Sequence, residues 1–538
     1  MKRQQQRFKR FNPLLILGGS FLPLLIPLAL TPPAQSQDVE LDVGIVQRFG
    51  DEKTDKMVIS STDGDLLKLR FLAGNMQPQT VQTDKVTLEM TAQPLSQPQL
   101  QERIVLSDHA TFETAEDSAK QWEKKGIAVE VTQPDRWQVW AKRGVYKTPL
   151  LRRRLLESLQ AQGETSPYLE SEVLTEVQRL SFVVNGYRYS RQRLDISSNK
   201  NLFRVDVEND DQPPRLYAGN LKMQPNSYGN YTLVNQVPLE TYLRGVVPHE
   251  IGSGAPFAAA QAQTIIARTY ALRNLRRFKA DGYQLCANTH CQVYWGLTGT
   301  SDRSDSAIAS TRGLVLTYNN ELVDALYSST TGGVTASFSD IWNGEERPYL
   351  QAVVDSPKVI WDISNKSLAD EATFRQFISL KDGFNEAGRS VFRWNKSSNI
   401  DQLSADLNRY LKRIKHPLVG FNKIQKMEVT KRSPSGRILE MTVNTDKGVV
   451  KLYKTEVRCA FGPPRSTLFY IDPIYGANQQ LKGYAFVGGG FGHGVGLSQY
   501  GSYNLANLGW SPELILSFYY PGTEIKSLDT SIVFYDGD

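Results

Sequence analysis

The chain has 538 residues, of which 40% are hydrophobic and 10% aromatic. That composition is globular, and the length is sufficient for about two to four domains. The formal net charge of +6 is modest for this size. It suits an anionic partner such as a wall polymer or a membrane surface, and without a dense basic stripe nucleic acid is not an expected partner.

The first 36 residues predict export from the cytoplasm. A basic segment at residues 2–10 precedes an apolar run at residues 14–30, and the small residues Ala34 and Ser36 suit the −3 and −1 positions of a candidate cleavage site. We expect a secretory signal peptide. An uncleaved membrane anchor is the alternative, although the run is slightly short for a span of about 20 residues. The protein is therefore expected in the periplasm or cell wall, with any membrane contact confined to this segment.

Residues 38–92 form an N-terminal segment that predicts β structure. A strand is expected at residues 40–49, where Leu41, Val43 and Ile45 alternate with polar residues. The Pro- and Gln-rich stretch at residues 93–101 is interpreted as a linker.

Residues 103–165 predict a small α+β module with the element order β-α-β-β-α. Gly126 is expected to end its first helix. The elements are expected at residues 103–106, 114–125, 127–131, 137–141 and 147–162. This order resembles the SPOR domain, a small peptidoglycan-binding module that recognises glycan strands lacking stem peptides. An unrelated α+β insert is the alternative.

Residues 179–237 predict further strands, with a tight hairpin turn at Asn185-Gly186. Two helices are expected next, at residues 238–247 and 256–279, and each begins near a Pro that suits a first helical turn.

Glu250 lies in the Gly- and Pro-bounded connection between these two helices. The second helix is rich in Ala, so a neighbouring carboxyl group packs closely against it and is partly buried. Desolvation raises the pKa of a carboxyl group and makes it available as a general acid near neutral pH.

The segment around Glu250 closely resembles the SpoIID family. Residues 237–251 read VPLETYLRGVVPHEI and residues 260–271 read AQAQTIIARTYA. They are similar to the family's PLEEYL-GVV-sEM segment and ALKAQAVAARTYA helix, with Ile251 in place of Met and Gln261 in place of Lys. The resemblance implies that Glu250 is the catalytic residue.

Cys286, His290 and Cys291 lie within six positions and predict a zinc site, because two thiolates and an imidazole bind one zinc ion when a turn brings them together. Some members of the SpoIID family carry this block and bind zinc with it. The ion is expected to hold the loop near the cleft. The alternatives are a free or redox-active thiol pair, or a disulfide between Cys459 and one of the two.

Two further segments resemble SpoIID motifs. Residues 327–335 read YSSTTGGVT, and residues 488–501 read GGGFGHGVGLSQYG. The second lacks the Lys and the βαβ context of a nucleotide-binding loop. A Ser/Thr-rich turn without a binding role is the alternative for the first. The substrate groove that these matches imply contains Arg268, Ser329, Thr330, His493, Ser498, Gln499 and Tyr500.

The resemblance extends over residues 179–530 and implies both fold and function. The expected fold is α+β, with mixed sheets and a long helix lining a substrate groove, preceded by the small module. The expected activity is that of a lytic transglycosylase, which cleaves the MurNAc–GlcNAc bond of peptide-stripped peptidoglycan strands with a single acid. Asp340 and Glu240 are the candidates for a second carboxylate, and Glu240 better suits a helix N-terminus. The alternative is a non-catalytic amidase enhancer that binds the wall and assists a cell-wall amidase.

Overall fold

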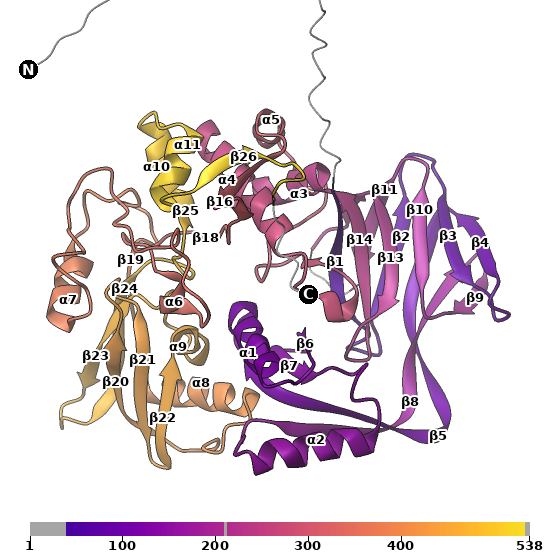
Figure 1. Ribbon diagram of the computed structural model, residues 1–538, viewed down its shortest axis with the longest axis horizontal. Coiled ribbons are helices and arrows are strands. Elements are labelled where there is room, and N and C mark those ends of the chain that lie inside the picture. Colours follow the sequence, from indigo (N-terminus) through magenta and orange to yellow (C-terminus); the bar gives the residue numbers. More distant parts are fainter. Residues whose placement is uncertain (1–38, 209–211, 533–538) are drawn as a thin grey trace, which may run out of the picture. The chain divides into compact units, whose positions relative to one another are not determined.

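The computed structural model describes residues 39–208 and 212–532 (Figure 1). The predicted signal peptide or anchor lies outside the described residues. Within the described ranges, no helix combines the length and the apolar character that a membrane span requires. Helices alternate with several mixed and antiparallel sheets, which confirms the predicted α+β class.

Two large sheets contain most strands of the N-terminal half. The first has the order β15-β1-β14-β13-β10-β3-β4, and only the β1–β15 pair is parallel. Its strands are β1 (Glu40–Phe49), β3 (Leu67–Leu72), β4 (Pro78–Thr83), β10 (Leu194–Ser198), β13 (Asn220–Pro225), β14 (Tyr231–Pro238) and β15 (Leu285–Cys286).

The second sheet has the order β12-β11-β2-β5-β7-β6, and two further strands extend from β5. Its strands are β2 (Lys56–Ser61), β5 (Lys85–His109), β6 (Val129–Thr132), β7 (Trp137–Ala141), β8 (Tyr168–Val184), β9 (Tyr187–Ser190), β11 (Leu202–Val207) and β12 (Arg215–Ala218). The predicted hairpin turn is confirmed, since Asn185 and Gly186 join β8 to β9 with φ values of +51° and +80°.

One hydrophobic core is shared by the two sheets. Val43 and Leu69 from the first sheet lie in the same buried cluster as Ile59, Leu88 and Phe182 from the second. The alternation along each strand directs one row of side chains into this core. Strands from residues 38–92 and from residues 179–238 therefore build the same pair of sheets.

The linker prediction for residues 93–101 is wrong. These residues belong to β5, a strand of 25 residues that pairs antiparallel with β8. The register is irregular between Pro94 and Gln99, as expected where a Pro has no N–H to donate. Most side chains here are exposed, so the stretch lacks the apolar alternation of a half-buried strand, and the partner strand supplies the hydrogen bonds instead.

The predicted β-α-β-β-α order of residues 103–165 is confirmed. Helix α1 (Phe112–Lys124) buries Phe112, Ala115, Ala119 and Trp122 against β5, β6 and β7. Gly126 follows the helix with a φ of +81°, as predicted. Helix α2 (Pro149–Ala161) ends the module. The resemblance to the SPOR domain stays a prediction.

The predicted helix pair is present as α3 (Leu239–Glu250) and α4 (Phe257–Arg273). Pro238 and Pro256 directly precede their first residues, as predicted. The connection is shorter than expected, because α3 continues through Pro248 and Glu250 is its last residue.

Helix α4 ends earlier than predicted. The N–H of Asn274 bonds to Ala271 and Tyr270, and its side-chain amide donates to the Tyr270 carbonyl at 2.8 Å. These bonds satisfy carbonyls that a helix end leaves without partners.

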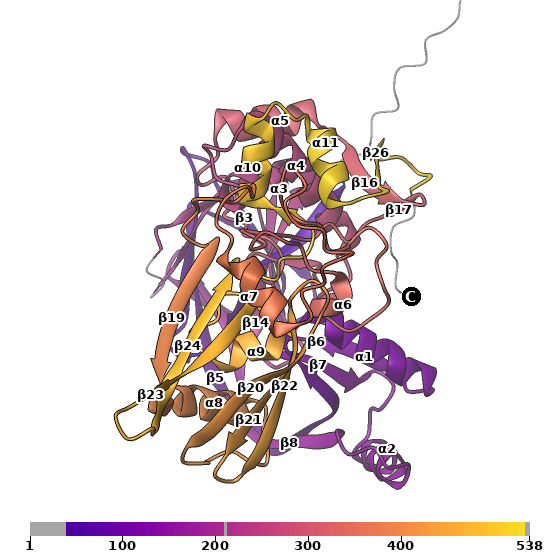
Figure 2. The ribbon, with the colours of Figure 1, turned by 90° about the vertical axis from the view of Figure 1, so that its left-hand side faces the viewer.

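The described part of the C-terminal half, up to residue 532, contains four small sheets. The strands of the sheets β19-β24-β23 and β20-β21-β22 share a core with α8 (Figure 1, Figure 2). The strands are β16 (Leu314–Tyr318), β17 (Glu321–Leu322), β18 (Tyr327–Ser328), β19 (Arg393–Asn399), β20 (Ile424–Arg432), β21 (Ile438–Thr445), β22 (Gly448–Tyr453), β23 (Phe469–Tyr475), β24 (Leu481–Gly489), β25 (Leu497–Ser498) and β26 (Glu524–Ser527). The helices are α5 (Asp302–Ser310), α6 (Phe338–Ile341), α7 (Glu371–Ser379), α8 (Ile400–Arg413), α9 (Thr455–Ala460), α10 (Gln499–Asn507) and α11 (Pro512–Tyr519).

Candidate functional site

Glu250 lies in a cleft of about 860 Å³. The cleft is large enough for several sugar rings. Most of its wall comes from five segments that are far apart in the sequence, namely residues 111–113, residues 289–291, residues 326–329, residues 455–467 and residues 491–499. The first segment begins the helix α1 of the small module, so that module contributes directly to the cleft.

The Glu250 carboxyl group is held by three neighbours. The N–H of Val293 donates to its Oε1 at 2.6 Å, and the side chains of Tyr327 and Gln499 also hydrogen-bond to it. Burial raises the pKa of Glu250 to about 7, although these three hydrogen bonds act in the opposite direction. A carboxyl group with this pKa holds a transferable proton near neutral pH, which is what a general acid requires.

Helix α10 fixes the end of α3. The side-chain amide of Gln499 donates to the backbone carbonyl of Glu250 at 2.8 Å, and the Tyr503 hydroxyl bonds to the carbonyl of Ile251. These carbonyls belong to the last residue of α3 and to its C-cap, and the helix has no intrahelical partners for them. The C-terminal motif therefore positions the acid from a distance of 249 residues along the chain.

The two glycine-containing motifs lie side by side. Strands β18 and β25 form a parallel pair in which Tyr327 is opposite Leu497. Thr330 and Phe491 form a further bridge. As a result, residues 327–329 and 491–493 form one continuous part of the cleft surface together with Glu250, whereas residues 330–335 are buried.

A buried carboxylate that the sequence did not reveal supports this surface. Glu386 is fully buried and accepts the three successive N–H groups of residues 331–333, together with the hydroxyl of Ser498 at 2.5 Å. From the other side, the Arg437 guanidinium donates to the carbonyls of Thr331 and Val334. No motif surrounds Glu386 or Arg437, so only their partners indicate their role.

Three of the predicted groove residues, Ser329, His493 and Gln499, line the cleft with Glu250. The His493 Nδ1 accepts the N–H of Val495 at 3.0 Å. Burial, together with the charge of Arg458, lowers the pKa of His493 to about 3. His493 is therefore a neutral imidazole at neutral pH and is suited to hydrogen bonding rather than to donating a proton.

Arg268 does not belong to the groove, contrary to the prediction. It is fully buried and forms two hydrogen bonds to the carboxylate of Glu240, at 2.7 and 2.8 Å. A third goes to the carbonyl of Leu314 at 2.9 Å. The pair joins α3, α4 and β16 inside the protein, and it also removes Glu240 as a second carboxylate in the cleft.

The remaining three predicted groove residues do not line the cleft either. Thr330 is fully buried, and the Ser498 hydroxyl both donates to Glu386 and accepts the N–H of Gly501 at the start of α10. Tyr500 lies under the guanidinium of Arg389, 4.6 Å from the ring centroid. None of the three is among the residues that line the cleft.

Asp340 does not line the cleft as a second carboxylate. It closes a capping box with Ser337 and accepts the Ser435 hydroxyl at 2.5 Å. The other carboxyl group on the cleft wall besides Glu250 is that of Glu113, which is paired with Arg277 at 2.9 Å. Within the described residues, Glu250 is thus the one cleft-lining acid without a cationic partner.

The three predicted zinc ligands do not form a metal site in this arrangement. Cys286 and Cys291 are joined in a disulfide, so their sulfurs are bonded to one another, and His290 is exposed. No group of three His, Cys, Asp or Glu side chains is placed to hold a metal in residues 39–208 and 212–532. The disulfide closes a short loop that leads directly to Val293, the donor to Glu250. Zinc binding by the reduced loop stays a prediction.

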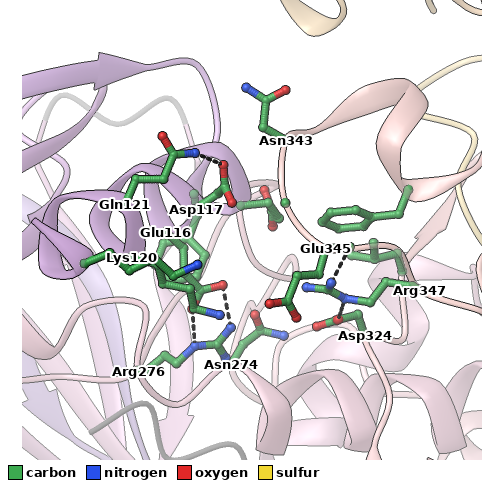
Figure 3. Close-up of a pocket in the computed structure, with 16 residues that line it drawn as sticks. Glu116, Asp117, Lys120, Gln121, Asn274, Arg276, Asp324, Asn343, Glu345 and Arg347 are labelled. Carbon is green, nitrogen blue, oxygen red and sulfur yellow. Dashed lines mark hydrogen bonds and ion pairs between the residues drawn. The ribbon is translucent and has the colours of Figure 1, made fainter. Parts of the chain in front are cut away.

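The small module is attached to the cleft by ion pairs. The Arg276 guanidinium binds the carboxylate of Glu116 at 2.5 and 2.9 Å, beside the pair of Arg277 with Glu113. Figure 3 shows Glu116 and Arg276 on one side of a cavity of about 90 Å³, opposite Arg347, which binds Asp324. These ion pairs therefore hold helix α1 in place as part of the wall of the Glu250 cleft.

Comparison with known proteins assigns these segments. Residues 227–318 match the family model described as Stage II sporulation protein, and residues 336–496 match a domain of unknown function, DUF8618. The first match contains Glu250, and the second contains Glu386 and Arg458.

Curated relatives share this region. The amidase enhancer of Bacillus subtilis (strain 168) is 26% identical over 413 residues, covering 68% of this chain and 53% of that protein. The chain thus spans about half the length of that relative. Stage II sporulation protein D of the same organism is 28% identical over 339 residues, 59% of this chain and 84% of that protein. Its counterpart in Bacillus amyloliquefaciens is 26% identical over 317 residues, 56% of this chain and 78% of that protein. With the family model, these relatives support the assignment of this region to the SpoIID/LytB family.

Proposed function

We propose that this chain acts on the bacterial cell wall as a lytic transglycosylase. Its substrate in this proposal is the peptidoglycan glycan strand, and peptide-stripped strands are preferred. The observation that carries the proposal is the partly buried, hydrogen-bonded carboxyl group of Glu250 in an open cleft, with its pKa raised to about 7.

The proposed reaction needs one protonated carboxyl group. Glu250 donates its proton to the oxygen that bridges MurNAc C1 and GlcNAc C4, and the bond from C1 to that oxygen breaks. The 6-hydroxyl oxygen of the same MurNAc attacks C1, and its proton passes to the Glu250 carboxylate. The products are a GlcNAc-terminated strand and a 1,6-anhydro-MurNAc end, and the acid is restored without consumption of water.

The distribution of carboxyl groups favours this reaction over hydrolysis. A hydrolase needs a second carboxylate across the scissile bond to activate water or to attack C1. Among the described residues of the cleft wall, the other carboxylate, Glu113, is neutralised by Arg277. A reaction in which the sugar supplies its own nucleophile has no need of a second free carboxylate.

The second candidate function is that of an amidase enhancer. It is favoured by the relative of that name, which matches 68% of this chain. In this case the cleft would bind glycan without turnover and would present it to a cell-wall amidase. In both cases we propose that the protein is exported, and that the SPOR-like module adds glycan contacts through the wall that α1 forms.

The proposal is tested by mass spectrometry of peptide-free glycan strands after incubation with the purified protein. Glu250→Gln is the test variant, and Glu513→Gln, at an exposed position on α11, is the matched control. We expect anhydro-MurNAc products from the parent and the control but not from Glu250→Gln. Reducing ends in place of anhydro ends would establish hydrolysis. Absence of products from the folded parent, together with stimulation of an amidase, would favour the enhancer.

A further inference from the structure

Three cations line the same cleft as Glu250 and have no acidic partner. They are Lys396 on β19, Arg458 on α9 and Arg465 just after α9. No carboxylate in residues 39–208 or 212–532 lies within ion-pair distance of any of them. The other arginine on the cleft wall, Arg277, is instead paired with Glu113.

Arg458 lies close to the catalytic end of the cleft. Its charge acts on His493, the ring of His493 hydrogen-bonds to the backbone of Tyr327, and the Tyr327 side chain hydrogen-bonds to Glu250. Arg458 therefore lies near His493, and His493 and Tyr327 connect this part of the cleft wall to Glu250.

Arg465 lies beside the same motif. Its carbonyl accepts the N–H of Gly492 at 3.1 Å, and its guanidinium is 5.8 Å from the ring centroid of Phe491. The Phe491 ring is 48% exposed. An apolar ring next to a guanidinium offers a sugar both a stacking face and a charged donor.

An unpaired cationic wall is chemically specific. Unpaired cations in a cleft gain most from an anionic ligand, and a guanidinium fork matches the two oxygens of a carboxylate. A GlcNAc unit carries no charge. A MurNAc unit carries a lactyl group, which is a neutral amide while the stem peptide is attached and a free carboxylate once the peptide has been removed.

We propose that Arg458 and Arg465, with Lys396, form a subsite for the free lactyl carboxylate of peptide-stripped MurNAc. The inference rests on the proposed function, because it takes the glycan strand as the occupant of the cleft. It deepens that function by giving a chemical reason for selecting stripped strands: removal of the peptide creates the anion that the subsite binds.

The test measures binding to Glu250→Gln protein, which leaves the ligand intact. Three ligands are compared: peptide-free GlcNAc–MurNAc oligosaccharide, the same oligosaccharide with its carboxylates converted to methylamides, and a chitin oligosaccharide of equal length. We expect the carboxylate form to bind about tenfold more tightly than the methylamide form, because hydrogen bonds to charged groups contribute at least about that factor.

The variants assign this difference to residues. Arg458→Gln and Arg465→Gln should each reduce the ratio of the two affinities while leaving the affinity for the chitin oligosaccharide unchanged. Arg204→Gln, at an exposed position on β11 outside the cleft, should keep the full ratio. Circular dichroism establishes that each variant is folded. If a variant does not fold, the ratio of the carboxylate and methylamide affinities of Glu250→Gln protein itself tests the subsite.

Two outcomes would overturn the subsite. One is equal affinity of the Glu250→Gln protein for the carboxylate and methylamide forms. The other is stronger competition by poly(glycerol phosphate) than by the carboxylate oligosaccharide, which would assign the cations to a phosphate polymer. Failure of the proposed activity is a separate result: a protein that cleaves no strand but keeps the affinity ratio retains the subsite, whereas cleavage with a ratio of one refutes only the subsite.

Discussion

At the residue scale, the protonation state of Glu250 sets the pH dependence of the proposed reaction. Burial raises its pKa to about 7, so the acid form predominates below pH 7 and is lost above it. We therefore expect the rate of strand cleavage to fall as pH rises through about 7. The Tyr327 hydroxyl stabilises the carboxylate, so Tyr327→Phe should raise the pKa further and move the alkaline limb to higher pH.

Cleavage rates of the parent and of Tyr327→Phe, measured between pH 5 and about pH 9, check this expectation. Tyr453→Phe is the matched control, because Tyr453 is 48% exposed on β22 and does not line the cleft. An alkaline limb that stays in place or moves to lower pH in Tyr327→Phe would show that the hydroxyl does not act on the acid.

Also at the residue scale, local sequence indicated which side chains are polar and near the cleft but not which way they face. Arg268 and Ser329 both lie in segments that resemble SpoIID motifs. Arg268 is nevertheless fully buried against Glu240, whereas Ser329 lines the cleft. The difference depends on a partner 28 residues away, which no local pattern specifies.

At the element scale, the loop from Cys286 to Cys291 connects β15 to the donor of Glu250. The chain contains three Cys residues, and with Cys286 and Cys291 in a disulfide, Cys459 is the one free thiol. We expect one reactive thiol per chain after denaturation without reductant, and three after reduction. Reduction of the native protein should slow strand cleavage, because it loosens the loop that places the Val293 N–H on Glu250.

Thiol titration and metal analysis of the same preparation check this prediction. Three titratable thiols without reductant, together with one bound zinc ion per chain, would support the zinc site expected from the sequence. In that case, strand cleavage should be slowed by removal of zinc with a chelator, and not by a reductant.

At the scale of the whole molecule, the small module and the cleft are joined by charge. Arg277 is buried and is paired with Glu113 on α1. Glu113→Gln removes the countercharge of a buried cation and is expected to lower the free energy of unfolding by about 3 kcal/mol. Because α1 forms part of the cleft wall, this variant should also bind glycan more weakly.

Denaturant unfolding and glycan binding measure the two effects. Glu123→Gln, on an exposed position of the same helix, is the control and should change neither quantity. Unaltered stability of Glu113→Gln would mean that the pair does not hold the module to the cleft in solution.

Local sequence patterns predicted many of the elements and singled out Glu250 as the candidate acid. Strand β1, the Asn185-Gly186 turn and the starts of α3 and α4 depend on side-chain period and on Pro or Gly preferences within a few residues. The α+β class and the role proposed for Glu250 follow from the same local patterns and from the family resemblance.

The tertiary structure establishes which distant chain segments meet. It paired residues 93–101 with β8, placed Glu386 beneath the 331–333 turn, and gave the cleft three cations without acidic partners. It also joins Cys286 to Cys291 in a disulfide, whereas the sequence predicted a zinc site there. In each case, the hydrogen bonds, charge pairs and burial depend on groups that are distant in the sequence. A local sequence pattern does not specify these partners.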